Sequence, residues 1–158
     1  MQKITTFLWF NNDAEEAINL YVSLFKNSKV LTVSRYGDAG PGPKGQVMTA
    51  TFQLDGQQFM ALNGGPLFPF TEAISLFVAC ETQEEVDTLW AKLTADGGKE
   101  SQCGWLKDKF GLSWQIIPSA LPRLISDRNP KKSQAVMKAM LQMKKIHIRG
   151  LQTAYDGA

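Results

Sequence analysis

The two halves of this chain predict the same order of strands and helices, and this internal repeat constrains the fold more than any other feature of the sequence. In the first half, a predicted strand over Ile4–Phe10 precedes a helix that begins at Asp13, with Glu16 at capping-box spacing. In the second half, a predicted strand over Ile74–Cys80 precedes a helix that begins at Thr82-x-x-Glu85. The two helices superpose at an offset of 69 residues.

The remaining predicted strands complete the repeat. In the first half they are Val30–Tyr36, Val47–Leu54 and Gln58–Asn63, with the hairpin signal Asp55-Gly56 between the last two. In the second half they are Lys99–Cys103, Trp105–Lys107 and Ser113–Ile117. The last strands of the two halves align at an offset of 55 residues. The sequence therefore predicts an α+β fold of two tandem βαβββ modules.

Proline and glycine divide the chain into segments. The first module spans residues 1–63 and the second spans residues 73–118. A connector over residues 64–72 separates them, because its two prolines cannot serve in a central strand. Residues 119–158 lie beyond the repeat and form a helical C-terminal appendage, with helices predicted near Leu121–Ser126 and Ser133–Ile146.

Composition indicates a folded chain, since 44% of the 158 residues are apolar and 20% are charged. No stretch approaches the length of apolar sequence that a membrane helix needs, and Met1-Gln2-Lys3 lacks the apolar region of a secretory signal. We therefore expect a soluble, cytoplasmic protein with no membrane partner. Cys80 and Cys103 form no C-x-x-C motif and are expected to be free thiols.

Basic residues gather at the end of the chain, where residues 122–158 hold eight Lys and Arg against two Asp. The lysines in this region alternate with Val136, Met140 and Met143 at spacings of three and four, which predicts an amphipathic helix with a solvated face. No recognisable nucleic-acid-binding motif accompanies the charge, so a nucleic-acid partner is not expected.

Three strings of residues carry a resemblance to a known family. They are Leu8-Trp9-Phe10-x-x-x-Ala14-Glu15-Glu16-Ala17, Asn63-Gly64-Gly65-Pro66 and Cys103-Gly104-Trp105-Leu106-x-Asp108-x-x-Gly111-x-Ser113-Trp114-Gln115. With the two βαβββ modules, the chain resembles the vicinal oxygen chelate superfamily of glyoxalase I, bleomycin-resistance proteins and extradiol dioxygenases. More narrowly, it resembles the PhnB-like branch, which carries a 3-demethylubiquinone 3-methyltransferase domain label. The resemblance implies a mixed sheet curved into a cup around a small ligand, and a dimer.

The same resemblance places the metal-ligand positions of that superfamily on Thr6, Met60, Ser75 and Gln115. A hydroxyl, a thioether, a second hydroxyl and an amide are poor donors for the metals that such proteins use. His147 is the only histidine, and it lies beyond both modules without a ligand companion at suitable spacing. We therefore expect no metal and no other cofactor.

Strand alternation predicts the lining of the cup. If Thr6 and Ser75 face it, the alternating neighbours Leu8 and Phe77 do so as well, while Trp9 and Leu76 face the helices. The predicted ligand-binding residues are Thr6, Leu8, Met60, Leu62, Ser75, Phe77, Trp105, Ser113 and Gln115. Phe68 and Phe70 of the connector could add stacking area. Apolar groups with a few hydroxyls and amides are typical of a small-molecule pocket.

These residues favour a metal-free, small-molecule-binding protein. An alternative is an enzyme of unidentified reaction in the same cup, for which Cys103 is a candidate nucleophile. The segment Gly40–Gly45 matches G-x-G-x-x-G, but its two prolines and the strand that follows predict a hairpin loop over the cup rather than a dinucleotide site. Nothing in the chain predicts the alternating α/β layers in which S-adenosylmethionine is usually bound.

Exposed strand edges and the Met-rich segment Val136–Met143 predict a homodimer. A two-fold dimer would cover the edges that one small chain leaves unpaired.

Overall fold

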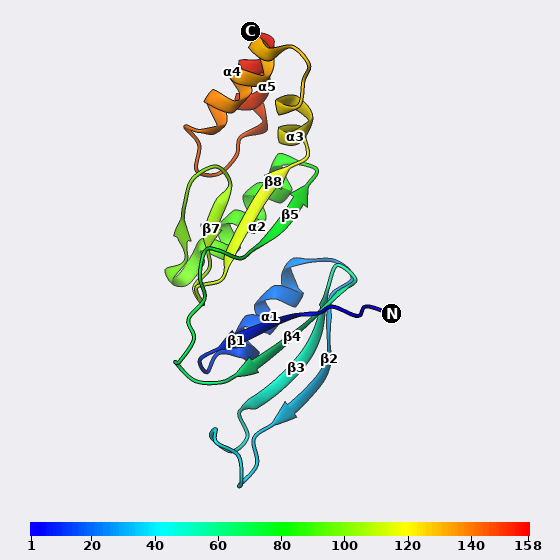
Figure 1. The fold of residues 1–158 in the computed structure, drawn as a ribbon, viewed down its shortest axis with the longest axis vertical. Coiled ribbons are helices and arrows are strands. Elements are labelled where there is room, and N and C mark those ends of the chain that lie inside the picture. The colour runs from blue at the N-terminus through cyan, green and yellow to red at the C-terminus, as the bar shows by residue number, and fades with distance from the viewer. The chain divides into compact units, whose positions relative to one another are not determined.

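Each half of the chain folds into a four-stranded mixed sheet with a helix against one face, which confirms the α+β class and the tandem modules (Figure 1). The computed structural model describes all 158 residues and divides them into two units, Met1–Phe70 and Thr71–Ala158. The first unit contains β1 (Thr6–Phe10), α1 (Ala14–Leu24), β2 (Lys29–Arg35), β3 (Val47–Leu54) and β4 (Gln57–Asn63). The second unit contains β5 (Ser75–Cys80), α2 (Gln83–Thr94), the short 3₁₀ turn η1 (Ala95–Gly97), β6 (Lys99–Glu100), β7 (Trp105–Lys107), β8 (Ser113–Pro118), α3 (Ala120–Ile125), α4 (Pro130–Met140) and α5 (Ile148–Asp156).

The two sheets have the same topology. Their strand orders are β1-β4-β3-β2 and β5-β8-β7-β6. The first and last strands of each module pair in parallel, and the other pairs are antiparallel. Each sheet therefore brings the beginning and the end of its module side by side.

The hairpin between β3 and β4 forms where Asp55-Gly56 predicts it. Asp55 and Gly56 both have positive φ angles, 47° and 84°. This conformation suits Gly and is tolerated by Asp, and it gives the turn a twist that matches the flanking strands. The local sequence thus fixes the register of this strand pair.

The core of the first unit lies between its sheet and α1. Apolar residues at helical spacing bury Ala14, Ala17, Ile18 and Tyr21 against the sheet. The sheet contributes buried side chains from three strands, among them Leu8, Phe10, Phe52, Phe59 and Ala61. The rings of Phe52 and Phe59 stack with their centroids 5.5 Å apart. Burial of each large apolar side chain contributes about 2 kcal/mol to stability.

The two helices begin in different ways, and one of the two predicted capping boxes is wrong. At α2 the Thr82 hydroxyl accepts a hydrogen bond from the Glu85 amide at 3.2 Å, as its spacing predicts. At α1 the Asp13 side chain makes no cap hydrogen bond. The Asn63 side chain at the end of β4 accepts from the Ala14 amide instead, at 2.9 Å. Asn63, 49 positions from Ala14 in the sequence, therefore makes the hydrogen bond that a neighbouring N-cap residue would usually make.

A buried carboxylate organises the turn between β7 and β8. Asp108 is 2% exposed. Its Oδ1 accepts hydrogen bonds from the amides of Phe110 and Leu112 at 2.9 and 3.0 Å. Its Oδ2 accepts from the indole nitrogen of Trp114 at 2.9 Å. The residues of the third family string around Asp108 therefore have a structural role in this hairpin.

The C-terminal appendage is a small helical layer with its own core (Figure 1). Helix α3 lies where Leu121–Ser126 predicts it, but the helix predicted over Ser133–Ile146 ends at Met140 as α4, and α5 was not predicted. Ile117 of β8 packs with apolar side chains of the appendage, which are Ala120, Leu121, Leu124, Val136, Ile146 and Leu151. None of the helices combines the length and the apolar character that crossing a membrane requires.

Hydrogen bonds with the second sheet explain why α4 stops. The carbonyls of Met143 and Lys144 accept from the amides of Cys103 and Gly104, each at 2.8 Å. A continuing helix would have used these carbonyls for its own hydrogen bonds. The Gln83 side chain then donates to the Ile146 carbonyl at 3.0 Å and accepts from the Ile148 amide at 2.7 Å. Four hydrogen bonds therefore join residues 143–148 to the turn before β7 and to Gln83 of α2.

Candidate functional site

The sheet of the second unit has one face under α2 and an opposite face, here called its open face. Ser75 is in register with Ser113, and Phe77 with Gln115, so these four side chains share a face. Trp105 is in register with Gln115 and joins them. Trp114 and Ile116 are almost fully buried and lie on the α2 side. The prediction that Ser75, Phe77, Ser113 and Gln115 lie opposite the helix therefore agrees with the register.

Ser75 and Gln115 form the polar centre of this face. The Gln115 Nε2 donates a hydrogen bond to the Ser75 hydroxyl at 2.9 Å. The Gln115 carbonyl oxygen and the Ser75 hydroxyl hydrogen have no other partner in the chain, so the pair offers one acceptor and one donor to a ligand. Phe77 is 59% exposed, and Trp105 is half-buried. Two aromatic side chains therefore accompany a hydrogen-bonding pair.

Ser113 and Lys107 also lie on this face of the sheet. Ser113 has the right register, but it is only 1% exposed and does not present its hydroxyl to solvent. Lys107 is in register with Ser113 and brings a positive charge to the same face, where it forms an ion pair with Glu72. Sequence reasoning missed Lys107, although alternation from Trp105 along the same strand would have placed it there.

The sheet of the first unit also has an open face, opposite α1. Met60 and Leu62 of β4 alternate with the buried Phe59 and Ala61 and lie on this face, as predicted. Register pairs them with Phe7 and Trp9 of β1. Phe7 is 47% exposed, and Trp9 is half-buried.

The predicted orientation of Thr6 and Leu8 is wrong. Thr6 is in register with the buried Phe59, and Leu8 with the buried Ala61. Leu8 is itself only 5% exposed. Both residues therefore lie on the face that α1 covers. A one-residue error in strand phase exchanges the two faces, so Phe7 and Trp9 take the positions that we assigned to Thr6 and Leu8.

The two connector aromatics, Phe68 and Phe70, pack against different rings. Phe68 packs edge-on against Trp9 with ring centroids 5.0 Å apart and stays 58% exposed. The Trp9 indole also donates to the Gly65 carbonyl at 2.9 Å, which holds the ring in place. Phe70 instead packs against the buried Phe10 at 5.1 Å. Of the two, only Phe68 extends the aromatic surface that begins at Trp9.

The four positions that the family resemblance assigns to metal ligands do not fit a metal. Thr6 lies on the covered face of the first sheet, whereas Met60 lies on its open face. Ser75 and Gln115 are already hydrogen-bonded to each other. Nowhere in the chain do three or more His, Cys, Asp or Glu side chains gather closely enough to hold a metal ion. The donor types and their orientation both argue against a metal centre at these positions.

The two cysteines are free thiols, as predicted. Cys80 is fully buried at the end of β5, and burial together with Glu85 and Glu81 raises the pKa of its thiol to about 12. Cys103 is half-buried, and its side chain has no hydrogen-bonded base or cation. An activated nucleophilic cysteine needs such a neighbour. The geometry therefore gives no support to a catalytic Cys103.

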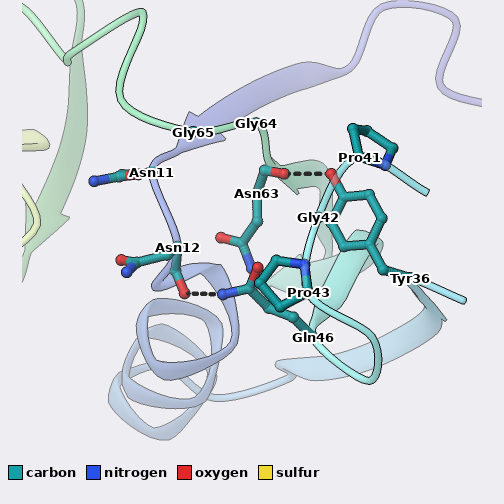
Figure 2. A pocket seen from close by; sticks show the side chains of 10 residues that line it. All are labelled: Asn11, Asn12, Tyr36, Pro41, Gly42, Pro43, Gln46, Asn63, Gly64 and Gly65. Atoms are coloured by element: carbon teal, nitrogen blue, oxygen red, sulfur yellow. Dashed lines mark hydrogen bonds between the residues drawn. The ribbon is translucent and has the colours of Figure 1, made fainter. Parts of the chain in front are cut away.

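A cavity of about 320 Å³ lies in the first unit (Figure 2). It is lined by Asn11, Asn12, Tyr36, Pro41, Gly42, Pro43, Gln46, Asn63, Gly64 and Gly65. The Tyr36 hydroxyl donates to the Asn63 carbonyl at 2.6 Å, and the Gln46 side chain donates to the Asn12 carbonyl at 3.1 Å. Both bonds join parts of the cavity wall to each other.

The side chains of Tyr36, Gln46 and Asn63 in the cavity wall already make hydrogen bonds within the chain. The Asn63 amide also donates to the Val47 carbonyl at 3.0 Å, so both ends of that side chain are used. Figure 2 shows the Asn11 and Asn12 side chains turned away from Tyr36. The Gly40–Gly45 segment lies between β2 and β3, which confirms a hairpin loop and not a dinucleotide site. The loop folds over this cavity of its own unit, where Gly42 sits against the Tyr36 ring.

Comparison with known proteins adds a family to this geometry. The family model described as 3-demethylubiquinone-9 3-methyltransferase matches residues 2–117. A solved structure of a Bacillus cereus PhnB protein, described with the same enzyme name, is 46% identical in sequence, with a TM-score of 0.71. The match covers 75% of this chain and 100% of that protein.

More distant structures share the fold alone. A protein from Pseudomonas aeruginosa is 22% identical, with a TM-score of 0.61, over 75% of this chain and 98% of its own. The fosfomycin resistance protein FosX of Listeria monocytogenes is 13% identical, with a TM-score of 0.50, over 75% of this chain and 92% of its own. Among curated proteins, no match is found.

Proposed function

This chain belongs to the family described as 3-demethylubiquinone-9 3-methyltransferase, the PhnB-like branch of the vicinal oxygen chelate superfamily, and on that premise we propose that it binds a small, partly aromatic molecule without a metal. The hydrogen-bonded pair Ser75–Gln115, accompanied by Phe77 and Trp105, is the observation that carries this proposal. A ligand that stacks on the aromatic rings could exchange hydrogen bonds with the Gln115 carbonyl and the Ser75 hydroxyl.

The first unit supports the same function with a more apolar surface. Phe7, Trp9, Met60 and Leu62 share its open face. Phe68 adds a second ring beside Trp9. These groups would contribute buried area rather than specific hydrogen bonds. By itself, the open face of the first unit would therefore suit a more apolar molecule than the open face of the second unit.

The methyltransferase named in the family description is not part of this proposal. Methyl transfer from S-adenosylmethionine usually takes place in an alternating α/β layer, whereas both units here are βαβββ modules. An enzyme of another kind remains the alternative function. It would need an acid, base or nucleophile near Ser75 and Gln115. The register places two cationic side chains on that face, Lys107 beside Ser113 and Lys99 beside Lys107.

Ligand-observed NMR with a panel of neutral aromatic amides and phenols would test the proposal on the full chain. We expect binders whose affinity falls about ten-fold in Gln115→Ala and in Phe77→Ala, the loss of one hydrogen bond or one stacking contact. Thr88→Ala, on the exposed face of α2, is the matched control and should bind normally. Equal affinity in all four proteins would contradict the proposed site. Chemical conversion of a bound compound would favour the enzyme alternative.

We also propose that the protein forms a homodimer and acts in the cytoplasm. The edge strand β2 is unpaired on one side and exposes Val30 and Val33, which a second copy could cover. Light scattering at micromolar concentration should give twice the 17.5 kDa mass of one chain. A mass of 17.5 kDa would contradict the dimer.

A further inference from the structure

The C-terminal appendage is an addition to the family fold. The family model ends at residue 117, one residue before β8 ends and just before α3. The Bacillus cereus protein is matched over its whole length by three quarters of this chain, so about a quarter of this chain has no counterpart in it. The ligand site proposed above uses none of the appendage. The role of these helices is therefore not explained by the proposed ligand site.

The appendage holds α4 rigidly. The Asn129 side chain caps α4 by accepting from the Lys131 amide at 3.0 Å. Lys132 donates to the Tyr155 carbonyl at 2.9 Å and lies over the Tyr155 ring at 4.3 Å. The Tyr155 hydroxyl donates to Asp127 at 2.7 Å. These contacts join α4 to α5 and to the segment before α4, so the remaining face of α4 is presented in one fixed orientation.

That remaining face has a shallow, open depression of about 480 Å³ between side chains of α4 and Leu141, here called the α4 groove. It is lined by Lys131, Gln134, Ala135, Met137, Lys138 and Leu141. Met137 is 39% exposed and Leu141 is 54% exposed, so the apolar surface is open to solvent. Neither Lys131 nor Lys138 has an ion-pair or hydrogen-bond partner through its side chain.

The charges on the groove decide what fits it. Residues 122–158 carry eight basic groups against two acidic ones, so nothing on the appendage neutralises the two groove lysines. A second copy applied by a two-fold axis through the groove would bring each lysine pair against another, which is unfavourable. A nucleic acid would not use the apolar groups of Met137 and Leu141. A helix that lies on a lipid surface buries a long apolar face, usually with aromatic residues, whereas this face exposes only Met137 and Leu141 as large apolar side chains.

We infer that the α4 groove docks an acidic amphipathic helix of a partner protein, whose apolar side chains enter between Met137 and Leu141 and whose carboxylates pair with Lys131 and Lys138. An amphipathic helix presents apolar side chains at spacings of three and four, and these can pack along the exposed side of α4. Methionine has a flexible, polarizable side chain that adapts to different apolar anchors. This inference does not depend on the proposed ligand site, because it uses other residues.

Fluorescence anisotropy with a labelled synthetic helix would test it on the full chain. The probe carries leucines at spacings of three and four with glutamates on both sides of them. A second probe replaces the glutamates by lysines, and a third replaces the leucines by serines. We expect the acidic probe to bind and both altered probes to bind at least ten-fold more weakly.

Matched variants locate the binding surface. The double variant Lys131→Glu/Lys138→Glu should weaken binding of the acidic probe at least ten-fold, whereas Lys92→Glu on α2 should change it less than two-fold. Leu141→Ser should weaken binding at least three-fold, whereas Leu67→Ser, at a more exposed leucine of the first unit, should not. Each variant changes an exposed side chain, so circular dichroism should show unchanged folding.

Two results would overturn the inference. One is equal binding of the acidic probe to the wild-type protein and to the Lys131→Glu/Lys138→Glu and Leu141→Ser variants. The other is tighter binding to anionic lipid vesicles or to duplex DNA than to the acidic probe, with the same dependence on Lys131 and Lys138. That result would make the groove a lipid or nucleic-acid surface instead.

Discussion

The first unit begins its helix with a side chain from a distant strand, whereas the second unit uses residues beside the helix itself. The Asn63 side chain at the end of β4 accepts a hydrogen bond from the Ala14 amide. The Thr82 hydroxyl accepts one from the amide of Glu85, three residues later. The turns before the last strands differ in a similar way. A two-residue turn closes β3–β4, whereas the buried carboxylate of Asp108 organises β7–β8. The shared topology thus follows from apolar pattern, while each unit satisfies its buried polar groups separately.

Removing the Asp108 carboxylate should have the largest effect on stability. Asp108→Ala leaves two backbone amides and the Trp114 indole without their acceptor in a buried loop. We expect the free energy of unfolding to fall by about 4 kcal/mol, measured by urea denaturation with tryptophan fluorescence. Asp108→Asn keeps an oxygen for the two backbone amides and should lose less. A loss below about 1 kcal/mol in Asp108→Ala would show that the carboxylate does not hold this turn.

Removing the distant cap of the first unit should have the next largest effect. Asn63→Ala removes the acceptor of the Ala14 amide and the donor to the Val47 carbonyl, both buried. We expect a loss of about 2 to 3 kcal/mol. Hydrogen exchange should also become faster at the Ala14 amide.

Gln53→Ala provides the matched control for Asn63→Ala. The Gln53 side chain also makes two hydrogen bonds, both to Asn27, but these are exposed to solvent. Its loss should cost less than about 1 kcal/mol. Equal costs for Gln53→Ala and Asn63→Ala would contradict the importance that we give to burial of the Asn63 amide.

The smallest expected effect compares the two cap positions directly. Thr82→Ala should cost about 1 kcal/mol, the usual value of a helix N-cap. Asp13→Ala should cost less than about 0.5 kcal/mol, because the Asp13 side chain makes no cap hydrogen bond. Thermal unfolding of the two variants in parallel would measure the difference. A larger loss for Asp13→Ala would reverse the comparison between the units.

Most of the fold could be predicted because its signals are local. Alternating apolar residues mark the long strands, and Asp55-Gly56 marks a hairpin. The cap by Asn63 could not be predicted from neighbours, because it depends on pairing of β1 with β4. The end of α4 depends in the same way on hydrogen bonds with Cys103 and Gly104, whereas the spacing of Ile148, Leu151 and Tyr155 was a readable signal for α5.

The faces of the strands were predicted correctly except for β1, where Thr6 and Leu8 were assigned to the wrong face. The helices superpose at an offset of 69, but the last buried residues of the preceding strands, Phe10 and Cys80, differ by 70. The connection before α1 is therefore one residue longer. Applying the helix offset to β1 shifted its phase and exchanged Phe7 and Trp9 for Thr6 and Leu8. The last strands do align at an offset of 55, so Met60, Leu62 and Gln115 were placed on the correct faces.

The hydrogen bonds that residues 143–148 make with Cys103, Gly104 and Gln83 affect the order in which the chain can fold during synthesis on the ribosome. The described hydrogen bonds of the first unit join residues no later than Gly65, so that unit can complete its sheet as soon as it emerges. In the second unit, the amides of Cys103 and Gly104 bond to carbonyls that are synthesised about forty residues later, and Ile117 packs with Ile146 and Leu151, which follow it by about thirty residues. We therefore expect a nascent chain to pass through a stage in which the first unit is folded while the second still exposes apolar surface, until residues 143–151 have emerged.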